Sequence, residues 1–430
     1  MAASGQNSVG VRVFELAQHL AGTNLFSLMF AALIFDIPRY TLSLISLALL
    51  IMLRGPSHSR TPPGGASVSV ILPAFNGAAG LDRSIASLRR QTLPPLEIIV
   101  VDDGSTDATR AIAERARARG EVDMVICHGT RCGRSAAVNA AARFARGDLL
   151  LTADSDTTFD PTTLARMAGV LRDPRVAAAS CNIDVTNERD TLTTGLQSVE
   201  YLMSLSAGRS FLDMIEAIAC CSGACSMYRR DVFMRRGGLD VGPGEDLEFT
   251  LRLRRLGHAV RFVPDAWATT AVPDNPVSLL RQRARWDRDA LRIRFMMYGE
   301  FSLFHPRERL PDTLQRLDFI VLDLIPTLMF PFYLIYIVAV FGGNATLFLG
   351  AVYVLMLVIS LFNVALAFAL FNRSASFFSF SVALIFPLYQ GIVMKCARFV
   401  TYSAEILFAT SRHDDFVPPR VRRALLSGRG

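Results

Sequence analysis

Two long apolar segments near the C-terminus constrain this chain more than any other feature. Ala345–Phe371 contains no charged residue, and Phe319–Phe341 contains only Asp323. Gly342-Gly343-Asn344 separates the two segments. At a rise of about 1.5 Å per residue, a helix of either length crosses a hydrocarbon core of about 30 Å. The pattern therefore predicts a transmembrane hairpin. A buried helix of a soluble protein is the poorer alternative, because such helices rarely stay uncharged for so long.

Three further apolar segments leave alternatives open. Phe377–Met394 is interrupted by Pro387, so it either spans or returns as an interfacial helix. Leu25–Phe35 and Thr41–Leu53 predict two short helices with a turn near Pro38, or one tilted helix. A charged side chain is costly in lipid, so Asp323 is expected to face the interior of the bundle or the membrane interface. The alternative is that Asp323 lies close to the cytoplasmic end of its helix.

Composition and charge place the chain in the membrane rather than in solution or on nucleic acid. Hydrophobic residues make up 51% and charged residues 19%, and the formal net charge is +7. This excludes a disordered chain and argues against a purely soluble enzyme. Basic residues flank the apolar segments, so no nucleic-acid partner is expected. The positive-inside rule predicts a multi-pass protein of the inner or plasma membrane, with its middle portion and tail in the cytoplasm. Seven cysteines suit that reducing compartment.

The middle of the chain alternates short apolar strands with helical segments. The expected strands are Ser67–Phe75, Glu97–Asp102, Val122–Cys127 and Asp148–Leu151. The expected helices are Leu81–Arg90, a segment ending near Ala118, and Arg134–Ala145. Strands that are apolar throughout indicate a parallel sheet covered on both faces. In such sheets ligands bind at the carboxyl ends of the strands.

Acidic residues stand at those ends. Asp102-Asp103-Gly104 follows the second strand, and Asp154-Ser155-Asp156 follows the fourth. Carboxylates without a glycine-rich phosphate loop argue against a nucleotide site of the Walker or dinucleotide type. They suit a divalent cation that holds a phosphate ligand. Two aspartates alone are weak evidence for a metal site, but their position directly after a buried strand strengthens that evidence.

Two later motifs, one acidic and one basic, carry charged residues that could belong to a binding or catalytic site. Gly244-Glu245-Asp246 opens a predicted helix, and an N-terminal cap is the structural alternative there. Gln282-Arg283-Ala284-Arg285-Trp286 lies in the basic segment Val277–Tyr298. Its alternative is an amphipathic helix that lies on anionic lipid, and that role does not exclude another.

In this order and spacing, the four motifs resemble those of the processive family 2 glycosyltransferases. Pro73-Ala74-Phe75-Asn76 and Cys221-Ser222-Gly223-Ala224 complete the set, which covers about Ser67–Tyr298. The group includes cellulose, chitin and hyaluronan synthases. The local sequences of the motifs are most similar to those of the chito-oligosaccharide synthases that make nodulation-factor backbones. The resemblance implies an α/β fold of the GT-A type, with a mostly parallel sheet, helices on both faces and flanking transmembrane helices. It also implies a UDP-sugar donor, Mg²⁺ or Mn²⁺, and inversion at the anomeric carbon.

The resemblance implies a role for each matching residue. The catalytic residues would be Asp246, as general base, and Glu245. The donor would contact Pro73, Asn76, Asp102, Asp103, Arg134, Asp154, Gln282, Arg283 and Arg285. The acceptor would contact Ser222, Gly223, Ala224 and Trp286. The metal would be held by Asp156 with Asp154. Two positions depart from the family pattern: Gly77 stands where many members have Glu, and Arg134 stands where many have Lys.

The expected organisation has five parts: an N-terminal membrane region (1–60), a cytoplasmic catalytic domain (61–275), interfacial helices (276–316), a C-terminal transmembrane region (317–412) and a basic cytoplasmic tail (413–430). The expected function is transfer of hexose or N-acetylhexosamine units from UDP-glucose or UDP-N-acetylglucosamine to a growing β-linked glycan. Coupling to export and partner proteins for it stay open. The alternatives are transfer of a single sugar to a polyprenyl phosphate or membrane lipid, and a non-catalytic transporter or scaffold.

Overall fold

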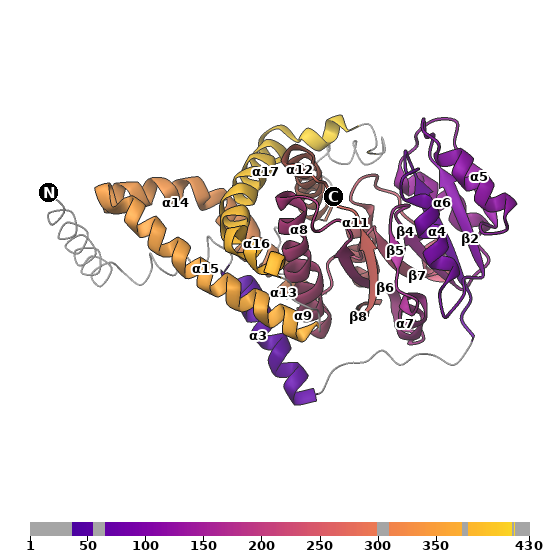
Figure 1. Ribbon diagram of the computed structural model, residues 1–430, viewed down its shortest axis with the longest axis horizontal. Coiled ribbons are helices and arrows are strands. Elements are labelled where there is room, and N and C mark those ends of the chain that lie inside the picture. The colour runs from indigo at the N-terminus through magenta and orange to yellow at the C-terminus, as the bar shows by residue number, and fades with distance from the viewer. Residues whose placement is uncertain (1–36, 55–64, 299–308, 372–376, 415–416, 418–430) are drawn as a thin grey trace.

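A central sheet of eight strands organises the part of the chain that the structure describes (Figure 1). The computed structural model describes residues 37–54, 65–298, 309–371, 377–414 and 417. Along the sheet the strands lie in the order β3-β2-β1-β4-β7-β6-β8-β5. Their bounds are β1 Val68–Ala74, β2 Glu97–Asp102, β3 Met124–Cys127, β4 Leu149–Ala153, β5 Thr158–Phe159, β6 Val176–Val185, β7 Cys225–Arg229 and β8 Ala259–Thr270.

The sheet is parallel in its first half and mixed in its second. All pairings within β3-β2-β1-β4 are parallel, as the sequence predicts. β7 is antiparallel to both of its neighbours, β5 is antiparallel to β8, and β6 is parallel to β8. The sheet is therefore mixed, with four parallel and three antiparallel pairings among the described strands. The sequence gives little sign of β7, because Cys225–Arg229 has no continuous apolar run and contains Ser226 and Arg229.

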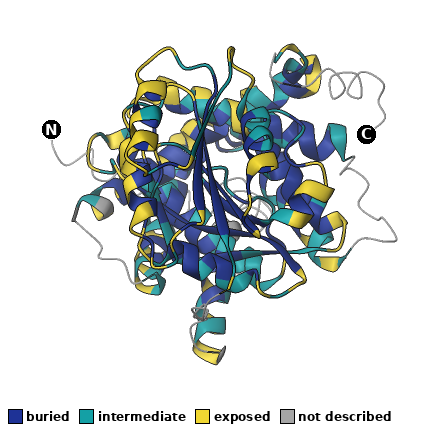
Figure 2. Ribbon diagram, turned by 90° about the vertical axis from the view of Figure 1, so that its right-hand side faces the viewer, coloured by how far each residue is buried: buried dark blue, intermediate teal, exposed yellow. Residues whose placement is uncertain are grey.

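Alternation along the strands packs helices on both faces of the sheet. In β1, Val70 and Leu72 join one apolar cluster, whereas Ile71 joins the other, as the two-residue period of a strand requires. The first face is covered by α4 (Leu81–Arg89), α5 (Thr109–Ala118) and α7 (Thr163–Val170). The second is covered by α6 (Arg134–Phe144), α10 (Arg230–Arg235) and α11 (Glu245–Arg255). Figure 2 shows the strands as the buried centre between helices whose outer sides are exposed.

The strand order places a topological switch point at the carboxyl end of β1. β1 lies between β2 and β4, so the connections from these parallel strands diverge to either side there. Ligands of open α/β sheets bind at such a point, outside the carboxyl ends of the strands. The segments that follow β1, β2 and β4 are 75–80, 103–108 and 154–157, and they include the acidic motifs.

Two helical runs, Leu310–Leu370 and Phe380–Phe408, are long and apolar enough to cross a membrane. The first contains the predicted hairpin: α14 (Ile325–Phe341) and α15 (Ala345–Leu370) meet at Gly342–Asn344 (Figure 1). The rings of Phe341 and Phe348 stack across the turn, with centroids 4.3 Å apart.

The remaining helices join these runs to the sheet domain. α16 (Phe377–Leu388) continues through Tyr389–Met394 into α17 (Lys395–Phe408), so the segment with Pro387 does not turn back at that residue. α17 packs on α12 (Pro276–Leu291), and α16 packs on α8 (Leu192–Tyr201). At the N-terminal end, Pro38 is the second residue of α3 (Ile37–Arg54), and Leu25–Phe35 lies outside the described residues. α13 (Leu310–Phe319) precedes α14, and α9 (Arg209–Met214) follows α8.

The expectation for Asp323 is confirmed. Its side chain is buried, and Arg398 of α17 donates a hydrogen bond to Asp323 Oδ1 at 3.0 Å. Because the carboxylate is paired within the helix bundle, it avoids the cost of an isolated charge in an apolar environment.

Candidate active site

Asp103 is a buried carboxylate that organises the segment following β3. Its Oδ1 lies 2.8 Å from His128 Nδ1 and accepts the N–H of Cys132 at 2.8 Å, and its Oδ2 accepts the N–H of Gly133 at 2.8 Å. The neighbouring Asp102 is also buried and accepts the N–H of Ser105 at 3.1 Å. Both aspartates of the first acidic motif therefore fix loops at the carboxyl end of β2.

The loop after β1 lies against both acidic loops. Asn76 has a φ of +53°, and its Oδ1 accepts the N–H of Thr106 at 2.9 Å. A Cβ on Gly77 would lie 2.5 Å from Ser155 Oγ. A side chain at this position would therefore require Ser155 to move. Pro73 is part of β1, where it pairs with Val101.

Asp156 and Asp154 share the loop that follows β4. Asp156 Oδ1 accepts a hydrogen bond of 3.4 Å from Thr270 Oγ1, and the Asp156 backbone packs closely on Gly80. Partial desolvation and the negative charge of Asp154 raise the pKa of the Asp156 carboxyl. Two carboxylates that repel each other in this way suit a divalent cation, which would relieve the repulsion.

Arg134, the first residue of α6, connects three distant segments of the chain. Its Nε donates to Asp154 Oδ1 at 3.2 Å, its Nη1 donates to Glu245 Oε1 at 3.1 Å, and its Nη2 donates to the carbonyl oxygen of Gly223 at 2.5 Å. Burial alone would lower the pKa of the guanidinium, but Asp154, Glu245 and Asp246 outweigh it and raise that pKa. In this structure Arg134 thus braces carboxylates.

Glu245 and Asp246 open α11 at the same place. Asp246 Oδ2 accepts the N–H of Gly223 at 3.1 Å, and Asp246 Oδ1 accepts the N–H of Leu247 at 2.8 Å. The N-cap of α11 is Gly244, which has no side chain to cap the helix, whereas Glu245 and Asp246 lie in the first helical turn, where acidic residues interact favourably with the helix dipole. Burial raises the pKa of Glu245, and the nearby Arg134 opposes that shift.

The segment 222–224 closes the cluster. Asp154 N–H donates to the carbonyl oxygen of Ala224 at 3.4 Å, and Ser222 N–H donates to Ser180 Oγ at 3.2 Å. The structure therefore brings together Arg134, Asp154, Glu245, Asp246 and Gly223, which the sequence places as far as 112 residues apart (246 − 134).

The residues of the fourth motif lie on α12 and face in different directions. Arg283 is buried, donates to Glu200 Oε2 at 3.0 Å, and its Cζ lies 4.3 Å from the centroid of the Trp286 ring. Arg285 is exposed, and 43% of Trp286 is exposed. Gln282 is partly buried.

Among the described residues, no hydrogen bond or ion pair joins any of these α12 side chains to the cluster around Arg134. Arg283 instead lies toward the helices, paired with Glu200. Sequence reasoning did not identify Glu200. Its signal is an acidic residue in a helix whose neighbours, such as Val199 and Tyr201, are buried.

A second residue that the sequence analysis missed, Arg292, links α12 to the turn before Glu245. Its side chain is fully buried and donates to the carbonyl oxygens of Val241, at 3.4 Å, and Pro243. A Cβ on Gly244 would lie 2.6 Å from Ile293 Cδ1, so the turn also packs directly on the segment after α12. The acidic turn is therefore supported by the helix that carries Trp286.

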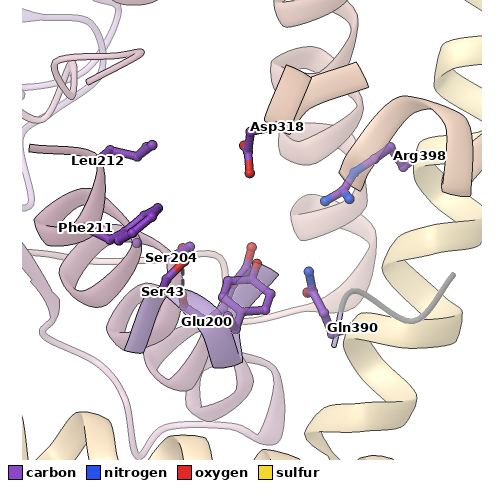
Figure 3. Close-up of a pocket in the computed structure, with 10 residues that line it drawn as sticks. Ser43, Glu200, Ser204, Phe211, Leu212, Asp318, Gln390 and Arg398 are labelled. Carbon is purple, nitrogen blue, oxygen red and sulfur yellow. Dashed lines mark hydrogen bonds between the residues drawn. The ribbon is translucent and has the colours of Figure 1, made fainter. Parts of the chain in front are cut away.

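A separate cavity of about 200 Å³ lies among helices, lined by residues of α3, of the run from α8 to α9, of α13 and of the run from α16 to α17 (Figure 3). Its polar lining includes Glu200, Asp318, Gln390 and Arg398, whose side chains converge on it in the figure. Glu200 belongs both to this cavity and to the pair with Arg283, and Tyr389 donates to Glu200 Oε2 at 2.7 Å. The cavity is thus connected to α12 through one carboxylate.

The order of the strands and the helices on both faces of the sheet define an α/β fold of the GT-A type. The computed structure shares its fold with a mannosyltransferase from Pyrobaculum calidifontis, solved in complex with GDP-Man and Mn²⁺. That likeness has a TM-score of 0.59 at 20% sequence identity and covers 88% of this chain and 99% of the other.

Residues 69–237 match the model of Glycosyl transferase family 2, so this segment is similar to the glycosyltransferase domains of that family. This confirms the resemblance to family 2 for the motifs within that segment, whereas Gly244-Glu245-Asp246 and Gln282–Trp286 lie beyond it. An N-acetylglucosaminyltransferase of Rhizobium leguminosarum bv. viciae is 35% identical over 238 residues, which are 53% of this chain and 56% of the relative. One of Rhizobium meliloti is 33% identical over 253 residues, which are 56% and 59%. The matched region thus spans less than two thirds of these relatives.

Proposed function

We propose that the protein is a membrane-embedded, inverting glycosyltransferase that adds N-acetylhexosamine units from a UDP-sugar to the end of a growing β-linked glycan. The sequence leaves UDP-glucose and UDP-N-acetylglucosamine open as donors. The names of the two relatives favour UDP-N-acetylglucosamine. The two apolar helical runs support an integral membrane protein, with the sheet domain in the cytoplasm.

The observation that carries this proposal is the convergence on Arg134. This one side chain contacts Asp154 from the end of β4, Glu245 from the start of α11 and Gly223 from the segment before β7. Asp246 reaches the same segment through the N–H of Gly223. The proposed donor side, catalytic base and acceptor border therefore lie within one connected network, as a single displacement reaction requires.

The residues present fit a divalent cation. Asp154 and Asp156 offer carboxylate oxygens from one loop, and their mutual repulsion favours a cation between them. Bound there, Mg²⁺ or Mn²⁺ would neutralise charge on the diphosphate of the donor. Asp102, Asp103, Pro73 and Asn76 would contact the nucleoside side.

The proposed reaction is one displacement at the anomeric carbon. A hydroxyl of the acceptor sugar attacks that carbon, the bond to the β-phosphate oxygen of UDP breaks, and Asp246 takes the proton of the hydroxyl. Because only one displacement occurs, an α-linked donor gives a β-linked product. Asp246 is held by the N–H groups of Gly223 and Leu247, which fix its direction.

The residues of α12 would act on both substrates. Arg285 and Gln282 would bind the diphosphate as negative charge develops on it, and the exposed face of Trp286 would stack on the acceptor sugar. Arg283 is buried against Glu200, so we propose that it orients Trp286 rather than contacts the donor. Ser222 and Ala224 would border the acceptor.

A donor screen with the purified protein in detergent tests the proposal. The protein would be incubated with Mg²⁺ or Mn²⁺ and labelled UDP-N-acetylglucosamine or UDP-glucose. We expect label from UDP-N-acetylglucosamine in a water-soluble oligosaccharide or polymer. Label confined to chloroform-extractable lipid would instead support transfer of a single sugar to a lipid acceptor.

The matched variant is Asp246→Asn, which keeps the size of the side chain but removes the base. General-base catalysis contributes about 10²–10⁴-fold, so we expect a loss of that size with little change in donor affinity. Unchanged transfer by Asp246→Asn would refute the catalytic assignment. No transfer by the wild type from any donor would favour a non-catalytic transporter or scaffold.

A further inference from the structure

We propose that Asp103, His128 and Cys132 form a binding site for Zn²⁺ that is separate from the Asp154–Asp156 cation site. One ligand atom from each of the three residues lies within 4.8 Å of the others: a carboxylate oxygen, an imidazole nitrogen and a thiol sulfur. These are the ligand types that Zn²⁺ prefers, whereas Mg²⁺ and Mn²⁺ prefer oxygen ligands.

The three residues come from loops that the fold already holds together. Asp103 follows β2, His128 follows β3, and Cys132 lies two residues before α6. His128 and Cys132 thus share the one segment 128–133 between β3 and α6. A Cβ on Gly104 would lie 2.8 Å from the backbone nitrogen of Arg131, so the loop after β2 touches this segment. The N–H groups of Cys132 and Gly133 fix the Asp103 carboxylate, and such hydrogen bonds to a ligand orient it toward a metal.

Only a small rearrangement is needed to complete the site. Zn–N and Zn–S bonds of about 2.0 and 2.3 Å put tetrahedral ligand atoms roughly 3.5 Å apart. His128 Nδ1 and Asp103 Oδ1 are already 2.8 Å apart, so they must separate slightly to admit the ion. Cys132 is exposed, which leaves its side chain free to rotate inward from its contact with the carbonyl oxygen of Thr130.

The chemistry of the ligands sets two properties of this site. Cys132 must lose its thiol proton and His128 must offer the lone pair of Nδ1, so binding releases protons and tightens as the pH rises. Three protein ligands leave a fourth position open to water, which is the arrangement of an accessible rather than a closed structural zinc site.

Occupancy of the site would oppose donor binding, and this part rests on the proposed function. Asp103 is the carboxylate assigned to the nucleoside of the donor, and a carboxylate that ligates Zn²⁺ is no longer free to accept hydrogen bonds from a base or ribose. Zn²⁺ at this site would therefore act as an inhibitor that competes with UDP and with the UDP-sugar.

Cobalt substitution tests the site without any measurement of activity. The full chain in detergent would be titrated with Co²⁺ in excess Mg²⁺, so that oxygen-ligand sites are filled by a silent ion. Thiolate ligation gives a sulfur-to-cobalt charge-transfer band in the near ultraviolet, which carboxylates alone cannot give. We expect a band that saturates at one equivalent and is displaced by Zn²⁺.

Three variants locate the band. Cys132→Ser should abolish it, and His128→Gln should weaken Co²⁺ binding at least tenfold. Cys396→Ser is the matched control, since Cys396 is also exposed but lies on α17, and it should leave the band unchanged. Absence of the band in the wild type, or its persistence in Cys132→Ser, would overturn the proposal.

A separate titration with UDP distinguishes the two parts. We expect Zn²⁺ to raise the apparent Kd for UDP in the wild type but not in Cys132→Ser. If the cobalt band is present and UDP binding is unaffected by Zn²⁺, the metal site stands and the nucleoside role of Asp103 is refuted.

Discussion

Replacement of Arg134 by methionine tests the network at the centre of the candidate site. The change removes one charge that contacts Glu245 at 3.1 Å and Asp154 at 3.2 Å. At 3.1 Å and an effective dielectric constant of about 20, one such pair is worth about 5 kcal/mol before desolvation is counted. The side chains of Arg134 and Asp154 are 23% and 44% exposed, which weakens that pair, whereas Glu245 is 10% exposed.

Breaking a buried ion pair costs about 3–5 kcal/mol, and the partial exposure of Arg134 favours the lower end. We therefore expect Arg134→Met to lower the free energy of unfolding by roughly 3 kcal/mol. If the same interactions hold Asp246 in place for reaction, a loss of about 3 kcal/mol corresponds to roughly a 100-fold slower transfer. Arg134→Lys keeps the charge but cannot bridge three partners, so its effects should be intermediate.

The measurements are thermal unfolding in detergent and initial rates of sugar transfer at varied donor concentration. Arg143→Met is the matched control, because Arg143 is exposed near the other end of the same helix. If Arg134→Met unfolds at the wild-type temperature and only the KM for the donor rises, Arg134 binds the diphosphate and does not brace the carboxylates. That result would refute the reasoning above.

Three other changes probe the site and its support. Gly77→Ala puts a Cβ against Ser155 Oγ, so it should lower the free energy of unfolding by about 1–3 kcal/mol and weaken metal-dependent sugar transfer. Gly129→Ala is the control, because nothing lies within 4 Å of the new Cβ, and it should change neither the unfolding nor the transfer rate. Burial raises the pKa of the Asp289 carboxyl from 3.8 to about 6. The stability that its protonated form contributes is therefore present below pH 3.8 and is lost as the pH rises through 6. Between these pH values the unfolding temperature should fall less for Asp289→Asn than for the wild type. Trp286→Ala should raise the KM for an oligosaccharide acceptor about tenfold, Trp286→Phe should restore most of the loss, and equal kinetics for all three proteins would remove Trp286 from the acceptor site.

The first half of the sheet could be predicted from the sequence because its strands are buried on both faces and therefore read as apolar runs. Glu97–Asp102 matches β2 residue for residue, and Leu81–Arg90 matches α4 to within one residue. β7 and β8 could not be predicted from the sequence, because their residues mix polar and apolar side chains. The apolar hairpin was equally clear, since composition alone marks both helices and their glycine turn.

The candidate site could be predicted in part. The sequence predicts that the acidic motifs after β2 and β4 lie at the carboxyl-terminal edge of the sheet, because the ends of parallel strands meet there whatever conformation the loops adopt. The partners of each side chain could not be predicted. The contact between Arg134 and Glu245 depends on how α11 packs on the sheet, and the pair of Arg283 with Glu200 depends on α8, whose place no local pattern reveals.

The link through Arg292 has a consequence for how the protein can be divided. A fragment that ends at residue 275, where the sequence alone suggests that the catalytic unit stops, would lose the guanidinium that holds the carbonyl oxygens of Val241 and Pro243. It would also expose Gly244 where Ile293 now covers it. A fragment designed for crystallisation or screening should therefore extend through α12 to Tyr298, even though α12 would then lack α17, the helix on which it packs.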